Sequence, residues 1–217
     1  MCGILGVVSR KEIPILDALE RLRRLEYRGY DSAGFATKEG FILKKVGDID
    51  NLVKFVRERY PNLSSNIIIL HTRWATHGKV SEINAHPHTD CRERIYVVHN
   101  GTIDNYIELK EELEQRGHRF KSETDTEVIA HFIEDRLERG WDMKKIVKDM
   151  FDHFEGTYAI LVMFRNENKI YAIKNGSPLV LGLDEDTVYI ASDVYAFLDK
   201  TQEVVILDDY EFVEIEL

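Results

Sequence analysis

The chain has 217 residues, of which 44% are hydrophobic, so a domain of this length can bury a substantial core without cross-links. The formal net charge of −10 disfavours nucleic acid and anionic membrane surfaces as partners, and the longest apolar run, residues 158–164, is far too short to cross a membrane. The two cysteines, Cys2 and Cys91, are too few for a secreted disulfide framework, so the cytoplasm is the expected compartment.

Apolar periodicity and turn residues predict a mixed series of strands and helices. In the first half of the chain, strands are expected at residues 4–9, 33–37, 41–46, 67–70 and 95–98, and helices at 15–22 and 50–60. Pro14 suits the first turn of a helix, and Lys38-Glu39-Gly40 suits a hairpin turn.

The second half of the chain begins with three predicted helices, over residues 102–116, 126–139 and 142–154. Gly117 follows the first of them, as expected at a helix end. From residue 158 onward, apolar strands alternate with short polar turns. Sequential strands joined by tight turns favour antiparallel sheets, so the sequence predicts one α+β domain over residues 1–217.

Cys2 is the first candidate for chemistry, because removal of Met1 would leave a thiol and a free α-amine on one residue. An α-amine with a pKa of about 7.7–8.0 can accept the proton of a thiol with a pKa of about 8.5 near neutral pH. An N-terminal amine that acts as base for its own side chain is an established way to activate a nucleophile. A cysteine before an apolar strand can equally be a small core residue, so position alone does not decide.

Four polar segments follow buried strands or begin helices, where side chains can face a substrate. They are HTRWATHG at 71–78, NAHPH at 84–88, HNG at 99–101 and SETDTE at 122–127. Each alone has an ordinary structural interpretation, because Asn-Gly is a common turn and Ser, Thr and Asp cap many helices. Their combination with Cys2 favours a functional interpretation.

The histidines raise a second hypothesis, a metal-dependent hydrolase. Five of the eight histidines lie within residues 71–99, and the HPH motif at 86–88 has a spacing that can bind a metal. A catalytic zinc site needs three protein ligands and an open position. Glu82 and Asp90 nearby lack the helical H-E-x-x-H spacing, and Pro87 restricts how the two imidazoles converge. The pattern therefore disfavours a catalytic metal.

Taken together, the segments resemble the class II glutamine amidotransferases, which are N-terminal-nucleophile hydrolases that release ammonia from glutamine. The resemblance rests on MCGI, RLEYRGYDSAG, HTRWATHG, NAHPH, VVHNG and SETDTE, with NGSPLVLGL and YIASD further on. The tyrosines of EYRGYDSAG and the Arg73-Trp74 pair are most similar to the glutaminase domain of the glutamine–fructose-6-phosphate aminotransferases. The similarity runs from Met1 to about the end of the chain.

This resemblance implies a four-layer α/β/β/α sandwich of two antiparallel sheets. It implies that Cys2 is the nucleophile and, through its α-amine, the base. The side-chain amide of Asn100 and the backbone N–H of Gly101 would form the oxyanion hole, where both can donate to the developing charge. The implied glutamine-binding residues are Arg73 with Thr76 and His77 at the α-carboxylate, Asp125 at the α-ammonium, Trp74 at the ammonia outlet, and His86 in the glutamine loop.

The implied reaction is hydrolysis of L-glutamine to glutamate and ammonia through a Cys2 thioester, with no metal and no organic cofactor. The family's aminotransferases also carry a sugar-phosphate isomerase half that nothing here resembles, so that partner is expected in cis or in trans, and a homodimer is a further expectation. Three alternatives stay open. They are the glutaminase domain of another class II amidotransferase, a stand-alone N-terminal-nucleophile amidase, and a non-catalytic module that keeps the fold.

Overall fold

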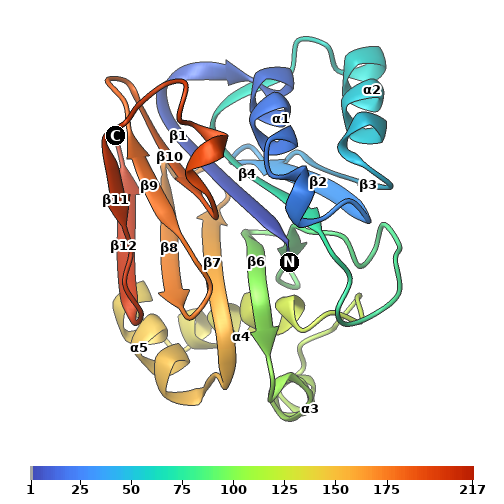
Figure 1. The fold of residues 1–217 in the computed structure, drawn as a ribbon. Helices are drawn as coiled ribbons and strands as arrows, with labels where there is room; N and C mark the ends of the chain where they lie inside the picture. The colour runs from blue at the N-terminus through green and yellow to red at the C-terminus, as the bar shows by residue number, and fades with distance from the viewer. Residues whose placement is uncertain (1) are drawn as a thin grey trace.

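Two antiparallel sheets form the centre of the computed structural model, which describes residues 2–217 (Figure 1). Within that range the seven-stranded sheet has the order β11-β9-β10-β1-β4-β2-β3, and the five-stranded sheet has the order β12-β8-β7-β6-β5. The strands are β1 (Gly3–Pro14), β2 (Ser32–Thr37), β3 (Ile42–Val46), β4 (Ser64–Arg73), β5 (His88–Thr89), β6 (Ile95–Ile103), β7 (Gly156–Phe164), β8 (Lys169–Asn175), β9 (Val180–Leu183), β10 (Thr187–Ala191), β11 (Val204–Ile206) and β12 (Glu211–Glu216).

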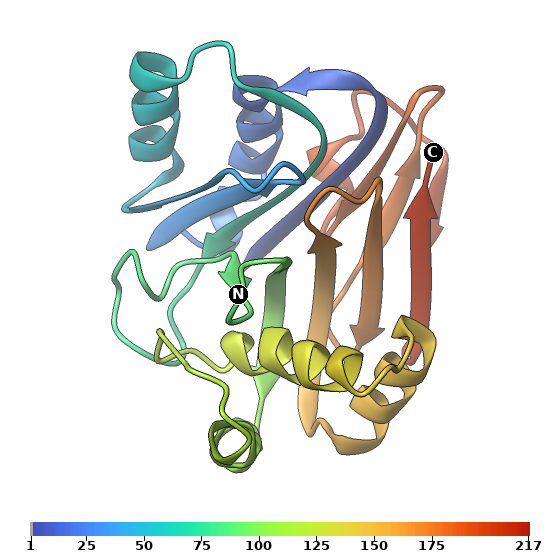
Figure 2. The same ribbon diagram turned by 180° about the vertical axis from the view of Figure 1, so that it is seen from behind.

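Helices cover the outer face of each sheet. Figure 1 shows α1 and α2 on the side of the seven-stranded sheet and α3, α4 and α5 on the side of the five-stranded sheet, and Figure 2 shows the same division from behind. The helices are α1 (Ile15–Arg23), α2 (Ile49–Arg59), α3 (Tyr106–Gln115), α4 (Thr126–Glu138) and α5 (Met143–His153), with short 3₁₀ turns η1 (Glu26–Arg28) and η2 (Val194–Ala196). No helix among the described residues is long and apolar enough to cross a membrane.

Strand β1 shows why the domain has four layers. Its side chains alternate between the two faces of the sheet, as in any strand. Leu5 and Val7 pack in the core beneath α1 and α2, whereas Ile4 and Val8 pack in the core between the two sheets. A third core lies between the five-stranded sheet and helices α3, α4 and α5. These three cores confirm the expected α/β/β/α sandwich.

The predicted start of one helix is wrong. A helix was expected from residue 102, but β6 continues to Ile103 and α3 begins only at Tyr106. Residues 100–103 instead pair with the first residues of β7, with Asn100 opposite Ala159 and Ile103 opposite Gly156. Pairing with a distant strand therefore overrides the local helical spacing, and Asn100 lies on a strand rather than in a turn.

Candidate active site

The ends of three strands and the start of one helix bring the sequence-predicted residues together. Cys2 directly precedes β1, and because Gly3 pairs with Thr72 of β4, Cys2 lies beside Arg73 at the end of that strand. Asn100 lies near the end of β6 in the facing sheet, and Asp125 is the N-cap residue of α4. Figure 1 shows the N-terminus of β1 beside β6. Residues from four distant parts of the sequence therefore meet at one point.

Hydrogen bonds hold Cys2 at this point through both its thiol and its carbonyl. The backbone N–H of Trp74 donates to Cys2 Sγ over 3.1 Å. The carbonyl of Cys2 accepts from Asn100 Nδ2 at 2.8 Å and from Arg28 Nε at 3.0 Å. Burial raises the pKa of the Cys2 thiol above its ordinary value, so the sulfur is protonated near neutral pH and needs a base in order to react. Arg28, in the EYRG segment, has a holding role that the sequence interpretation did not assign.

Asn100 and Gly101 sit side by side on β6, in positions that suit few other residues. The side chain of Asn100 is 2% exposed, and its amide nitrogen points at Cys2. Gly101 has φ of +113°, and a Cβ there would lie 2.2 Å from the carbonyl oxygen of Thr157. Any other residue at 101 would clash with β7, so glycine is required for this backbone to approach its neighbour so closely.

Arg73 is fastened to the loop that follows it. Its guanidinium donates to the carbonyl oxygens of His77, Gly78 at 3.3 Å and Lys79 at 3.1 Å. Burial lowers the pKa of Arg73, although the group stays cationic at physiological pH. The side chain therefore holds residues 77–79 in a curve around its positive charge and keeps that charge beside Cys2.

Two contacts fix the beginning of the same loop. The backbone N–H of Ala75 donates to Asp31 Oδ2 at 2.9 Å. Trp74 is 46% exposed, and its ring meets the ring of Tyr30 edge-on at 5.8 Å between centroids. The EYRGYDSAG segment thus supports residues 74 and 75, and the Trp74 indole stands at the surface near the partly buried Cys2.

Asp125 faces the same region from the five-stranded side. Its Oδ2 accepts the backbone N–H of Ile103 at 2.8 Å, which ties the start of α4 to the end of β6. The next residue, Thr126, places its hydroxyl 2.9 Å from His99 Nδ1 and 3.4 Å from His86 Nε2. A buried polar chain therefore joins Asp125 to the loop that carries His86.

Burial keeps His71, His86 and His88 neutral. The rings of His71 and His86 stack with 3.8 Å between centroids. Burial lowers the pKa of His71 to about 3 and holds the pKa values of His86 and His88 well below the ordinary value. Within residues 2–217, none of the five histidines of the sequence cluster belongs to a group that could hold a metal ion. The structure gives no support to a catalytic metal at these histidines.

A narrow cavity joins these side chains. Its lining contains all the sequence-predicted site residues except Asn100, which instead contacts Cys2 from behind. The lining residues are Cys2, Arg73, Trp74, Thr76, His77, His86, His99, Gly101, Thr124, Asp125 and Thr126. Sequence interpretation missed His99, Thr124 and Thr126 as wall residues. Their positions in the sequence could have identified them, because Thr124 and Thr126 flank Asp125 and His99 precedes Asn100.

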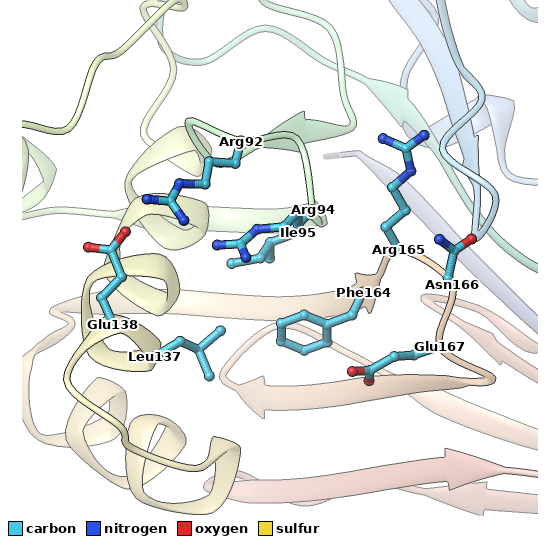
Figure 3. A pocket seen from close by; sticks show the side chains of 9 residues that line it. All are labelled: Arg92, Arg94, Ile95, Leu137, Glu138, Phe164, Arg165, Asn166 and Glu167. Carbon is cyan, nitrogen blue, oxygen red and sulfur yellow. The ribbon is translucent and has the colours of Figure 1, made fainter.

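A roomier cavity, of about 500 Å³, lies elsewhere on the surface (Figure 3). Figure 3 shows Leu137 and Phe164 inside it, with charged side chains around them. Its lining residues are Arg92, Arg94, Ile95, Leu137, Glu138, Phe164, Arg165, Asn166 and Glu167. None of them is a nucleophile or a sequence-predicted site residue, so size alone does not locate the chemistry in this fold.

Comparison with known proteins gives consistent results. A family profile described as a glutamine amidotransferase domain matches residues 71–199. The glutamine–fructose-6-phosphate aminotransferase (isomerizing) of Sulfurisphaera tokodaii is 46% identical over 97% of this chain, and that of Pyrococcus horikoshii is 48% identical over 98%. The chain spans 36% of the length of each of these two curated relatives.

Solved structures show the same fold. The glutamine phosphoribosylpyrophosphate amidotransferase of Bacillus subtilis, complexed with ADP and GMP, aligns with a TM-score of 0.77 and 25% identity, over 99% of this chain and 49% of its own. A predicted glutamine amidotransferase from Pseudomonas aeruginosa aligns with a TM-score of 0.59 and 14% identity, over 99% of this chain and 97% of its own.

Proposed function

Because the chain belongs to the class II glutamine amidotransferases, we propose that residues 1–217 form one glutaminase domain that hydrolyses L-glutamine to L-glutamate and ammonia. The observation that carries this proposal is that Cys2, Arg73 and Asp125 line one cavity, while the Asn100 amide donates to the carbonyl of Cys2 beside it. A nucleophile, an oxyanion donor and two opposite charges are what the reaction needs. Both cysteines are free thiols, which is consistent with the reducing cytoplasm that the sequence favours.

Substrate recognition follows from charge. Glutamine carries an α-carboxylate and an α-ammonium at one end and a neutral amide at the other. Arg73, with Thr76 and His77, suits the carboxylate, and Asp125 suits the ammonium, because charge-assisted hydrogen bonds are the strong ones. Asp125 already uses Oδ2 to fix Ile103, which leaves Oδ1 for the substrate. His86, in the wall of the cavity, helps to shape the loop through its contacts with His71 and Thr126.

In the proposed chemical steps Cys2 has two roles, since its thiol is the nucleophile and its α-amine is the base. The α-amine, free once Met1 is removed, takes the proton of the thiol, and Sγ forms a bond to the amide carbon of the substrate. Met1 itself lies outside the described residues. The carbonyl oxygen becomes an oxyanion, and the Asn100 amide with the Gly101 N–H donates to it. The C–N bond then breaks, and the leaving nitrogen takes the proton from the α-ammonium and departs as ammonia.

Hydrolysis of the thioester completes the cycle. The α-amine now accepts a proton from water as its oxygen bonds to the thioester carbon, and the C–S bond breaks to release glutamate and restore the thiol. The raised pKa of the Cys2 thiol supports these roles of the thiol as nucleophile and the α-amine as base. A thiol that is protonated in the resting state needs a base within reach, and the amine of the same residue supplies it. These steps require no metal or organic cofactor.

We further infer that the ammonia passes to a sugar-phosphate isomerase partner, in cis or in trans. The relatives at 46–48% identity are named glutamine–fructose-6-phosphate aminotransferases, whereas the glutamine phosphoribosylpyrophosphate amidotransferase of Bacillus subtilis is only 25% identical. Trp74 suits a gate at the ammonia outlet, because its backbone N–H contacts Cys2 Sγ while its indole reaches the surface. A homodimer stays a prediction.

The test uses the 217-residue chain alone. It should release glutamate and ammonia from L-glutamine, discriminate against L-asparagine, and form no glucosamine 6-phosphate when fructose 6-phosphate is added. Cys2→Ala is the matched inactive control. Equal turnover of asparagine would favour a broader N-terminal-nucleophile amidase. Absence of turnover in folded protein with a free N-terminal cysteine would favour the non-catalytic alternative and contradict the proposal.

A further inference from the structure

A second cluster of reactive side chains lies outside the Cys2 cavity. Cys91 in the turn between β5 and β6, His118 in the loop after α3, and His131 and Glu134 on α4 each direct one atom to a common centre. These four atoms all lie within 4.8 Å of one another. His118, His131 and Glu134 are buried, while Cys91 closes the cluster from the surface.

The separations between the four atoms fit a tetrahedral metal site. Zinc bonds of about 2.3 Å to sulfur and about 2.0–2.2 Å to nitrogen or oxygen place tetrahedral ligand atoms roughly 3.3–3.6 Å apart. Cys91 Sγ lies 3.5 Å from His131 Nδ1 and 3.9 Å from His118 Nδ1. Glu134 Oε1 lies 3.3 Å from His131 Nδ1 and 2.6 Å from His118 Nδ1. Of these four pairs, only the last is shorter than a tetrahedral site requires, and its two atoms must separate by about 0.7 Å to admit the ion.

The second nitrogen of each imidazole meets a carboxylate. His131 Nε2 lies 3.0 Å from Glu127 Oε2, and His118 Nε2 lies 3.4 Å from Asp135 Oδ1. Metal-bound histidines almost always donate their other N–H to such a group, which fixes the tautomer that presents the ligand nitrogen. The backbone N–H of Arg119 donates to Cys91 Sγ at 3.3 Å, as suits a thiolate. The surroundings therefore orient all the ligands inward.

Charge balance also calls for a cation. The carboxylate of Asp135 is paired with Arg136 and Arg139. The carboxylate of Glu134 is 2% exposed and meets the two histidines and the backbone N–H of Cys91 instead. A single proton on His131 Nδ1 cannot point at both Cys91 Sγ and Glu134 Oε1. A divalent ion at the centre would satisfy the thiol, both imidazoles and the carboxylate together, and would offset a costly buried charge.

We propose that Cys91, His118, His131 and Glu134 form a structural zinc site. Four protein ligands leave no open position, which is typical of structural rather than catalytic zinc, and the thiolate and imidazoles favour zinc over magnesium or calcium. The site fastens the β5–β6 turn and the loop after α3 to helix α4. It also supports the active site indirectly, because Glu127 accepts the backbone N–H groups of Lys121 and Ser122 at the start of the segment that leads to Asp125.

Metal analysis of untagged protein purified from zinc-supplemented medium tests the proposal. Elemental analysis should find one zinc ion per chain. After the zinc is removed with a chelator, Co²⁺ should give the intense visible absorption of a tetrahedral ion together with a thiolate-to-cobalt charge-transfer band. Zinc returned in large excess over its dissociation constant should raise the Tm by on the order of 10 °C.

Substitutions test which side chains bind the metal ion. Cys91→Ser changes an exposed turn and should fold, lose the thiolate band and bind zinc at least ten-fold more weakly. His131→Gln should abolish stoichiometric binding. Two matched controls should keep the metal: Cys2→Ser changes the other cysteine, and His153→Gln changes a surface histidine paired with Asp149. Folded wild-type protein that binds neither ion would overturn the proposal and leave a proton-sharing network, and so would a cobalt spectrum that Cys91→Ser leaves unchanged.

Discussion

Replacing Asn100 by alanine tests whether its side-chain amide is an oxyanion donor or only stabilises the fold. The change removes the amide whose Nδ2 lies 2.8 Å from the Cys2 carbonyl, while Arg28 Nε still holds that carbonyl at 3.0 Å. Cys2 should therefore stay in place. Loss of one oxyanion donor typically costs about 2.7–4 kcal/mol, so kcat should fall roughly 10²–10³-fold. Release of glutamate, followed with a coupled glutamate dehydrogenase assay, measures kcat and KM together.

The stability of the same variant gives the second half of the test. A lost buried hydrogen bond costs about 1–3 kcal/mol, and each kcal/mol lowers the Tm of a domain of this size by roughly 2–4 °C. Asn105→Ala is the matched control, since it removes hydrogen bonds to His153 and from Glu155 outside the cavity. It should lose stability but keep kcat within about two-fold. If Asn100→Ala also keeps its kcat while its Tm falls, Asn100 is a scaffold residue and the assigned role is refuted.

Three further predictions concern binding, pH and the base. Arg73→Ala and Asp125→Ala should each weaken glutamine binding by about 1.5–3 kcal/mol, roughly 10–150-fold in KM, and a fall in kcat with unchanged KM would contradict their roles. The pKa of His71 is about 3 in the folded protein, below its ordinary value of 6.5, so between these two pH values the unfolded chain takes up that proton and the folded chain does not. The contribution of this histidine to the free energy of unfolding should therefore be complete above pH 6.5. It should fall as the pH decreases, by up to about 1.4 kcal/mol per pH unit for each such histidine. A Tm that stays constant from pH 7.5 to 5 would contradict this. Protein with an uncleaved N-terminal extension should fold but turn over glutamine far more slowly, because its α-amine is no longer a base; full activity would remove the amine from the mechanism.

Most strands and helices were predictable because buried strands and amphipathic helices leave periodic apolar patterns. Their arrangement in four layers was implied by the resemblance to the class II glutamine amidotransferases and not by periodicity. Helix α4 was expected over 126–139 and is observed over Thr126–Glu138. Strand β6 was predicted too short, because Thr102 and Ile103 gain their partners from Thr157 and Gly156, far away in the sequence. The two-residue strand β5 leaves no pattern of its own and forms only by pairing His88 with Val97 and Thr89 with Tyr96.

Sequence motifs predicted the residues of the candidate active site but not those of the proposed zinc site. The residues around Cys2 lie in contiguous segments such as HTRWATHG and SETDTE, which carry recognisable order. The ligands Cys91, His118 and His131 come from separate segments and meet only through the packing of α4 against the loops. One local signal existed, because Glu127, His131 and Glu134 share a face of α4 at spacings of four and three residues, and all three are buried. The apolar residues of the same helix form a longer periodic pattern than these three polar residues do.

The central claim is that the thiol of Cys2 attacks glutamine while its own free amine acts as base. A diazoketone analogue of glutamine, which alkylates the attacking atom, tests it most directly when intact mass and peptide mapping are read on the same sample. The account predicts protein that lacks Met1, carries one adduct on Cys2 Sγ with loss of activity, and is protected by L-glutamine. An adduct on Cys91 with Cys2 unmodified, or full activity from protein that retains Met1, would contradict it.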